Sequence, residues 1–554
     1  MIAKRSSAVQ SKRITHGSQR GGVGPSGDQR AGGSQRSSSS TSPSLQVHLY
    51  FFPATKNATI IHITASHISA ENVCIQAGKK CGILPVHQSL FALASSDLSC
   101  WYPPSHMFNT EENLQVHFRV RFSFENWFGQ GPRTSYRFSL TRDTISPVLH
   151  YSVIDYLFTQ LRSDFIASEA GVCPPLSAQE ECLGLAVLDL WRMAKERHQS
   201  VRELCKTVSY KSCLPKLHRH DIQRRNRLDR FRIRNTLKRF LKKLGNCSID
   251  ESSLKLKYLI ELAGIEPSLG SETFQVNSSP SHSTSAFCLV RVTGETGIEM
   301  EWKTFCDFKD IIDIKIKRVC HEQVPQDSRM VTITRKDDRG LSLKEALSFV
   351  SLVDGYFRLT TDSSHYFCQD IAPPSILNGI KNHCHGPITS KFAVNKLKKS
   401  GFKGSAFLLR QSPKDYDNFF HTVCVQTPLG PDYKDCLIIK NEHYTLPGVQ
   451  KLFSSLRELT SYYQHNKLLL AEVPVKLGRY SPPRPKELTN LIIIRNNSSV
   501  EAQGSPMPER NKFSHIQFHM IKCEDLQWGE CLGQGYFTRI FKAIKPTFVM
   551  ERNT

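Results

Sequence analysis

The hydrophobic period changes repeatedly along this 554-residue chain, and these changes limit the folds that it can adopt. From Leu45 to Leu49 apolar residues alternate with other residues, as in a half-buried strand. From about 147 to 268 they recur at three-and-four spacing, as in amphipathic helices. Alternating segments then return and are followed by another helical one. A domain holds roughly 100–200 residues, so we expect several domains.

The first half of the chain predicts two lobes. Residues 45–146 contain short strand patterns and one helix, for which Ser69 is the expected N-cap and Gly82 the stop signal. Residues 147–268 predict an all-helical lobe. Its segment 182–191 is a core helix rather than a membrane span, because Asp189 interrupts the apolar run. Ser177 and Glu180 have the spacing of a capping box at the start of that helix.

The second half predicts two further units. Residues 269–383 read as antiparallel strands closed by the helix "SLKEALSFVSLVDGYFRL", which is typical of a pleckstrin-homology-like sandwich. Residues 384–480 read as helix, three strands and helix. Residues 481–516 have the composition of a linker, and residues 517–554 contain a strand–turn–strand pattern.

The net charge is +23, and basic residues concentrate in two places. Residues 1–44 are rich in Ser, Gly, Gln and Arg without an apolar period, which predicts a disordered basic tail. The second place is a predicted helix at 219–244, whose apolar stripe should include Ile222, Leu228, Phe231 and Leu237. Its basic face contains Arg224, Arg225, Arg227, Arg230, Arg234, Lys238 and Arg239.

The sequence leaves three interpretations of this basic face. The first is a solvated helix face without a partner, the second is a surface for an acidic peptide or an anionic membrane, and the third is a nucleic-acid surface. No zinc finger, RNP motif or helix-turn-helix pattern accompanies the charge, so we expect no nucleic-acid partner.

The cysteines and the apolar segments indicate the compartment. The 17 cysteines are odd in number and include no C-x-x-C pair, which predicts reduced thiols and no metal site. The N-terminus lacks the apolar core of a signal peptide, and no window approaches the roughly 20 apolar residues of a membrane span. We therefore predict a cytoplasmic protein, which could still lie against a membrane.

"FLLRQSPKD" at 407–415 has the residues of a phosphate site. Arg410 ends a buried strand pattern, where its charge is costly unless it meets an anion. With Ser412 in the next loop, it has the form of the phosphate grip of a Src-homology-2 (SH2) domain; otherwise it is an ordinary strand-end arginine on a solvated face. Asp435 stands where such domains usually have histidine. A carboxylate repels a neighbouring phosphate by roughly 1–4 kcal/mol, so phosphotyrosine binding should be weak.

"LGQGYFTRIFKA" at 532–543 has the form of a kinase glycine loop. Gly533 and Gly535 occupy its first two positions and Thr538 the third. Phosphoryl transfer also requires H-R-D and D-F-G motifs, which this chain lacks, and Lys545 of "KAIK" is wrongly spaced for the ATP lysine. We predict that this chain has no catalytic residues, no metal and no cofactor of its own, and does not transfer phosphate.

The order of these parts resembles the N-terminal portion of the Janus kinase family. The resemblance is carried by "LQVHLY", "CGILPV", "WYPPSH", "QEECLGLAVLDL", "LKLKYLI", "NHCHGPI", "SPKDYDNFF" and "LFSSLRELTSYYQ", and runs from 45 to about 543. It implies a multidomain α+β fold: a FERM domain at 45–383 with ubiquitin-like, helical and pleckstrin-homology-like lobes, an SH2-like domain and the first strands of a truncated pseudokinase. The N-terminal tail and the last eleven residues depart from the family pattern.

The resemblance also implies partners. The FERM and SH2-like modules would bind membrane-proximal segments of cytokine receptors, with a proline-rich segment on the helical lobe and an acidic, apolar segment on the SH2-like domain. ATP and magnesium belong to the full-length family, as do transcription factors of the STAT class. We expect this polypeptide to bind receptors at the inner face of membranes and to act dominant-negatively. The alternative is a FERM adaptor at the membrane cortex that binds anionic lipid and acidic protein tails.

Overall fold

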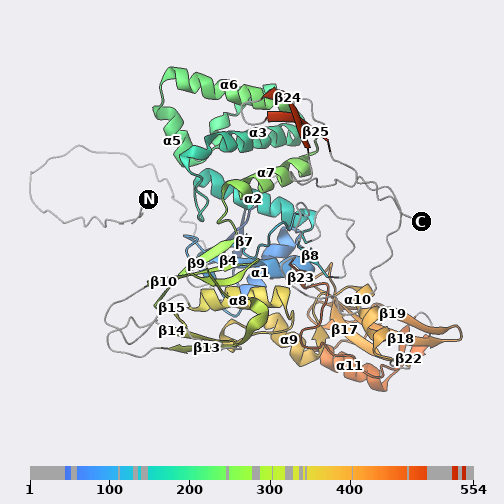
Figure 1. Ribbon diagram of the computed structural model, residues 1–554. Helices are drawn as coiled ribbons and strands as arrows, with labels where there is room; N and C mark the ends of the chain where they lie inside the picture. Colours follow the sequence, from blue (N-terminus) through green and yellow to red (C-terminus); the bar gives the residue numbers. More distant parts are fainter. Residues whose placement is uncertain are drawn as a thin grey trace, which may run out of the picture. The chain divides into compact units, whose positions relative to one another are not determined.

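The computed structural model describes most of the chain from Ser44 onward (Figure 1). The described residues are 44–50, 59–109, 113–128, 135–138, 148–244, 249–277, 287–301, 303–318, 329–335, 341–343, 346–401, 404–470, 473–495, 527–534 and 539–544. The predicted N-terminal tail and most of the predicted linker at 481–516 lie outside these residues.

The first lobe is a five-stranded sheet with one helix packed on it. The strand order is β2-β1-β7-β4-β5, in which β1 and β7 are parallel and the other pairs antiparallel. The strands are β1 Leu45–His48, β2 Ile60–Ile63, β4 Phe91–Ser95, β5 Trp101–Tyr102 and β7 Gln115–Val120, and a short pair is formed by β3 His67–Ser69 and β6 Met107–Asn109. The helix α1 spans Ala70–Lys80. As predicted, the Ser69 side chain caps it by accepting from the Asn72 amide, and Gly82 follows it with a positive φ of 68°.

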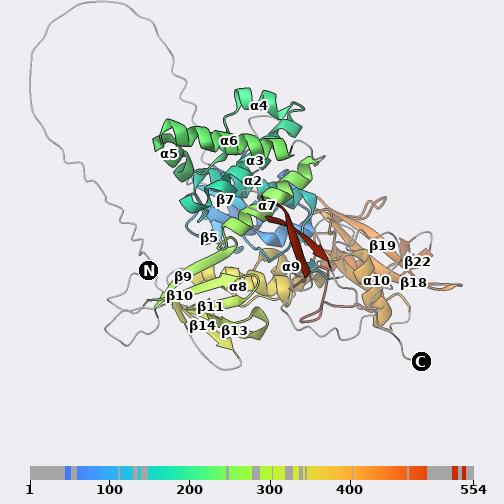
Figure 2. The ribbon, with the colours of Figure 1, turned by 45° about the horizontal axis from the view of Figure 1, so that its top comes forward.

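The second lobe is helical throughout its described residues. Its helices are α2 Tyr151–Ala167, α3 Gln179–Glu196, α4 Val201–Thr207, α5 Lys216–Arg224, α6 Arg227–Leu244 and α7 Glu251–Ile265. α3 contacts α4, α6 and α7, and Figures 1 and 2 both show α6 running beside it. Leu183, Ala186 and Leu190 of α3 are fully buried, which confirms the predicted core helix.

The predicted capping box of α3 is wrong. A short 3-10 turn, Leu176–Ala178, includes Ser177, so the N-cap position falls on Ala178 and no side chain caps this helix. A capping box does occur at α4, where Ser200 and Glu203 each bond the backbone of the other.

The third lobe is a seven-stranded antiparallel sheet with the order β12-β11-β10-β9-β15-β14-β13. Its strands are β9 Ser271–Asn277, β10 Phe287–Thr293, β11 Gly297–Met300, β12 Lys303–Cys306, β13 Ile311–Arg318, β14 Arg329–Arg335 and β15 Leu341–Leu343. The helix α8, Ala346–Thr360, packs on the sheet through Phe349, whose ring meets the ring of Phe274 of β9 edge-on, with the centroids 5.2 Å apart. This strand-and-helix order is the one that the sequence predicts for 269–383.

The fourth unit is a five-stranded sheet with a helix on each face. The order is β16-β17-β18-β19-β20, formed by β16 Cys384–His385, β17 Phe407–Gln411, β18 Asn418–Thr427, β19 Gly430–Lys440 and β20 Tyr444–Thr445. One face carries α10, Ser390–Lys399, through Ala393 and Leu397. The other carries α11, Leu456–His465, through Leu456 and Leu459. The sheet is therefore buried on both sides, which explains the apolar run of β17.

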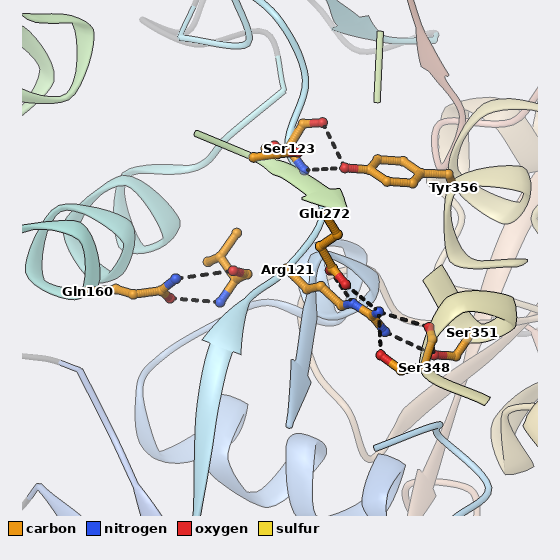
Figure 3. Close-up of polar contacts among 9 residues, drawn as sticks. Arg121, Ser123, Gln160, Glu272, Ser348, Ser351 and Tyr356 are labelled. Atoms are coloured by element: carbon orange, nitrogen blue, oxygen red, sulfur yellow. Dashed lines mark hydrogen bonds and ion pairs between the residues drawn. The ribbon is translucent and has the colours of Figure 1, made fainter. Parts of the chain in front are cut away.

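The first three lobes meet at polar contacts that fix the end of β7 (Figure 3). Gln160 of α2 pairs with both backbone groups of Val120, accepting from its N–H at 2.8 Å and donating to its carbonyl at 3.1 Å. Arg121 donates two hydrogen bonds to Glu272 of β9, at 2.7 and 2.9 Å. It also donates to Ser351 of α8 at 2.9 Å. One strand end thus contacts both neighbouring lobes.

The SH2-like unit is tied to the first lobe by side chains of one loop. The Tyr416 hydroxyl lies 2.9 Å from the Ile83 carbonyl and 2.7 Å from Gln88 Oε1. Asp417 forms an ion pair with Lys79 of α1 at 2.7 Å. The chain after this fourth unit then returns to the first three lobes.

The returning segment contacts both the first and the third lobe. Its strand β23, Ile493–Ile494, pairs with β8, Tyr136–Arg137. Arg495 donates to the Glu295 carbonyl at 2.9 Å and to Asp307 at 2.6 Å, both in the third lobe. These contacts hold the returning segment on the first and third lobes.

A hairpin is the last described element. β24, Gln527–Gln534, pairs antiparallel with β25, Arg539–Ile544, as the strand–turn–strand pattern predicts. Of the helices in the described ranges, none is long and apolar enough to cross a bilayer.

Candidate functional site

The predicted phosphate-site residues Arg410 and Asp435 lie on β17 and β19, the two strands that flank β18. Arg410 lies in β17, which packs against cores on both faces, and its side chain is only 3% exposed. Each of its three nitrogens has a protein acceptor: Nε donates to Thr422 Oγ1 at 3.0 Å, Nη1 to the Ile388 carbonyl at 3.2 Å and Nη2 to Asp435 Oδ2 at 2.7 Å. The Phe420 ring covers the guanidinium with its centroid 4.5 Å from Cζ.

The strand register explains why Asp435 reaches this arginine. Thr422 of β18 stands directly opposite Asp435 of β19, and the Thr422 hydroxyl donates to Asp435 Oδ1 at 2.5 Å. Burial lowers the pKa of Arg410, and the Asp435 carboxylate opposes that effect. The negative charge of this carboxylate offsets the cost of burying the positive charge of the guanidinium. The structure therefore brings Arg410 and Asp435 together as an ion pair.

Ser412, two residues after Arg410, bonds its own loop. Its hydroxyl accepts from the backbone amides of Lys414 and Asp415, both at 3.2 Å. This turn orders the loop between β17 and β18, which Tyr416 also ties to the first lobe. Ser390 and Lys391, at the start of α10, are exposed.

The predicted basic helix is two helices rather than one. α5 ends at Arg224 and α6 begins at Arg227, because Asn226 caps α6 by accepting from the Asp229 amide at 2.8 Å. The predicted apolar stripe is therefore wrong in part. Ile222 and Leu237 are buried as expected, whereas Leu228 and Phe231 are 72% and 59% exposed.

The phase of α6 explains this correction. Ile233, which the predicted stripe omits, is buried and lies one turn before Leu237. A helix turns about 100° per residue, so Leu228 and Phe231 fall on the opposite face. Arg227, Arg234 and Lys238 flank them on one side, and Arg239 on the other. The solvent face of α6 thus carries two large apolar side chains between basic residues.

The other basic residues of this face differ in their surroundings. Arg224 and Arg230 are exposed. Arg225 forms an ion pair with Asp221 at 2.7 Å, and Arg239 donates to Thr236 at 3.1 Å. We use the name α6 face for Leu228, Phe231 and the exposed cations of the predicted basic face, which are Arg224, Arg227, Arg230, Arg234, Lys238 and Arg239.

The glycine loop is described only in part. Gly533 pairs with Ile540 across the β24–β25 hairpin, while Gly535 and Thr538 lie outside the described residues. Over the described ranges, no group of three or more His, Cys, Asp or Glu side chains could hold a metal ion. One hairpin does not supply the lysine, base and carboxylates that ATP and magnesium require.

A cavity between β1 and α2 is a feature that the sequence does not reveal. Its volume is about 300 Å³, and its lining includes His48, Tyr50, Thr159 and Arg162. The Tyr50 hydroxyl contacts His117 Nδ1 at 3.0 Å, and burial lowers the pKa of His117 to about 4. These residues come from segments far apart in the chain, so no local motif marks them.

The chain matches the models of four known domains. These are the FERM F1 ubiquitin-like domain at 45–138, the FERM F2 acyl-CoA binding protein-like domain at 146–265, the Jak1 pleckstrin homology-like domain at 289–365 and the SH2 domain at 382–483. The chain is 44% identical to tyrosine-protein kinase JAK3 of Rattus norvegicus over 487 residues, covering 85% of this chain and 44% of the relative. It is 30% identical to tyrosine-protein kinase JAK1 of Danio rerio over 588 aligned positions, covering 91% of this chain and 49% of the relative.

The chain belongs to the Janus kinase family. It spans about half the length of these two curated relatives. A myosin VII MyTH4-FERM domain of Dictyostelium discoideum is similar in structure over 57% of this chain and 60% of its own, at 12% identity and a TM-score of 0.36. The predicted FERM and SH2 architecture is confirmed by the domain matches. Within the family we expect the greatest likeness to Janus kinase 2, and that finer assignment stays a prediction.

Membership of this family gives the site residues a context. The SH2 match covers Arg410, Ser412 and Asp435, and the FERM F2 match covers α5 and α6. The two candidate surfaces of this Janus kinase sequence therefore belong to different domains, which the Tyr416 and Arg495 contacts join.

Proposed function

We propose that this chain is the receptor-docking FERM–SH2 region of a Janus-type tyrosine kinase. It would bind membrane-proximal cytoplasmic segments of cytokine receptors, at the inner face of the membrane. The observation that carries this proposal is a set of contacts to the FERM lobes: Tyr416 of the SH2-like unit bonds Ile83, and Arg495 of the segment that follows the unit bonds Asp307. Two modules joined in this way can bind two segments of one ligand, and the second segment then binds at high effective concentration.

The α6 face supports a first docking surface. Its exposed arginines and lysines attract acidic groups, and Leu228 and Phe231 offer apolar contact beside them. A proline-rich receptor segment with acidic neighbours matches both properties. The carrying residues are the exposed cations Arg224, Arg227, Arg230, Arg234 and Lys238.

The loop between β20 and α11 supports a second docking surface. Leu452 is 57% exposed, and Val449 beside it is also exposed. Lys451 between them lies over the Tyr462 ring, 3.9 Å from its centroid. An apolar segment with acidic residues would meet complementary groups here without a phosphotyrosine.

We propose kinase activity and downstream partners only for a longer parent protein that contains this region. ATP, magnesium and STAT-class factors would act through that parent, whereas this chain contributes docking. When expressed with a full-length Janus kinase, this polypeptide would compete for the receptor and lower receptor phosphorylation.

Fluorescence anisotropy with labelled peptides from membrane-proximal receptor segments tests the docking proposal. The full chain should bind at least one peptide, and Arg230→Glu/Arg234→Glu should weaken that binding by about tenfold or more, since each reversed contact is worth on the order of 1 kcal/mol. Lys315→Glu/Lys317→Glu on β13 makes the same change of charge elsewhere and should leave binding unchanged. If both double variants lost the same affinity for the peptide, the loss would come from the change in net charge alone, and this would contradict a docking site at α6.

A second candidate function is binding to an anionic membrane surface. Exposed Leu228 and Phe231 flanked by cations are the arrangement by which interfacial helices enter the headgroup region. Sedimentation with vesicles containing phosphatidylserine tests it. Leu228→Ser/Phe231→Ser should then release the chain from vesicles, while binding to vesicles without any binding to receptor peptides would favour the membrane-cortex adaptor over the receptor-docking unit.

A further inference from the structure

The pocket around Arg410 is already occupied by a carboxylate of the protein itself. The guanidinium has acceptors on all three nitrogens, and its side chain is almost completely buried. The Asp435 side chain is 28% exposed, so it is the member of the pair that faces solvent. A ligand that approaches Arg410 from solvent therefore meets Asp435 first.

The carboxylate is held as a bound oxyanion would be held. Oδ2 accepts from Arg410, and Oδ1 accepts from the Thr422 hydroxyl at 2.5 Å. A guanidinium and a hydroxyl are the donors that hold two oxygens of a phosphate in a protein site. The Asp435 carboxylate therefore occupies both donors as a phosphate would: it is negatively charged and accepts one hydrogen bond on each of its two oxygens.

The other walls of the pocket do not depend on Asp435. Ser412 is fixed by its bonds to the Lys414 and Asp415 amides. The loop that carries it is held on the first lobe by Tyr416, through Ile83 and Gln88. Nε and Nη1 of Arg410 keep their acceptors without the carboxylate. Loss of Asp435 should leave a formed anion pocket rather than a collapsed one.

We propose that Asp435 is a built-in occupant of the anion pocket, which excludes phosphotyrosine from a site otherwise formed to receive it. Asp435 is then a residue that determines specificity: it removes the preference for phosphotyrosine that the site would otherwise have. The inference goes beyond the docking proposal, because it concerns only the occupant of this pocket and holds whether or not the chain binds a receptor.

The test compares full-length chains with a fluorescein-labelled pool of phosphotyrosine peptides, degenerate at the flanking positions, and the same pool without phosphate. The wild-type chain should not distinguish the two pools. Asp435→Gly should bind the phosphorylated pool about tenfold or more tightly than wild type, because the repulsion between two neighbouring charges is removed. Addition of Arg410→Ala should abolish this gain.

Two further variants separate charge from space. Asp432→Gly removes another carboxylate of β19, which pairs with Lys434 instead, and should give no gain. Asp435→Asn keeps the shape of the occupant without its charge and should give a smaller gain, which also decides the question if Asp435→Gly does not fold. The proposal is overturned if wild type already prefers the phosphorylated pool in an Arg410-dependent way, or if both folded Asp435 variants show no gain.

Discussion

Arg121 joins the first FERM lobe to the third at their junction, and its replacement by alanine should destabilise the chain strongly. The side chain is 2% exposed, and its partner Glu272 is 22% exposed. Two bonds to Glu272 and bonds to the Ser348 carbonyl and the Ser351 hydroxyl are lost together. The Trp101 ring, 5.0 Å from Arg121 Cζ, loses its cation as well.

The size of this effect follows from the burial of the pair. Removal of one partner of a buried ion pair costs about 3–5 kcal/mol, and the partial exposure of Glu272 favours the lower end of that range. At about 2–4 °C per kcal/mol, a loss of about 3 kcal/mol lowers the unfolding temperature by roughly 6–12 °C.

Thermal unfolding followed by circular dichroism measures this effect. Arg121→Met/Glu272→Gln should recover part of the loss, because it leaves no unpaired charge. Arg232→Ala is the matched control: its side chain is 80% exposed, its ion pair with Asp229 is 3.4 Å long, and the expected cost is below about 1 kcal/mol. A shift for Arg121→Ala no larger than that of Arg232→Ala would refute the role of Arg121 at the junction.

Three further predictions address packing, the returning segment and pH. Gly355→Ala should destabilise the chain by about 1–3 kcal/mol, because a Cβ would lie 2.2 Å from the Phe122 ring, whereas Gly184→Ala in open space should stabilise it by up to about 1 kcal/mol; thermal unfolding of both variants checks the contrast, and equal shifts would contradict it. Arg495→Ala should speed limited proteolysis after residue 480, since its bonds to the third lobe are lost, and an unchanged rate would show that β23 alone holds the segment. His421 is fully buried, and burial lowers its pKa to about 3, so the unfolded state binds the additional proton and stability falls as pH drops from about 6.5 towards 3. His421→Leu should therefore reduce the fall of the unfolding temperature between pH 7 and 5, while other histidines with a lowered pKa, such as His117, keep part of it, and an unchanged slope would contradict this role.

The sequence predicts best those features that depend on neighbouring residues. The Ser69 cap, the buried α3 and the alternating strands of the third lobe are local patterns, and the structure confirms them. The break between α5 and α6 was missed because its cause is the side chain of Asn226, which a stripe of apolar residues does not report. For this reason Leu228 and Phe231, which the apolar pattern predicts to be buried, are exposed in the structure.

Features that depend on distant residues could be predicted only in part. The SH2 resemblance placed Asp435 in the phosphate pocket, but the pairing of β18 with β19 shows that Thr422 and Arg410 both bond to it. The two-residue strands β8 and β23 carry no periodic signal, although they join segments more than 350 positions apart. Such contacts depend on the packing of whole domains.

Hydrogen–deuterium exchange of the full chain, with and without a bound membrane-proximal receptor segment, tests most directly whether the two modules dock one ligand together. The account predicts slower amide exchange in α6 and in the SH2-like loop around Leu452 upon binding of the same segment. Protection confined to one module, or absent from both while the segment is bound, would contradict it.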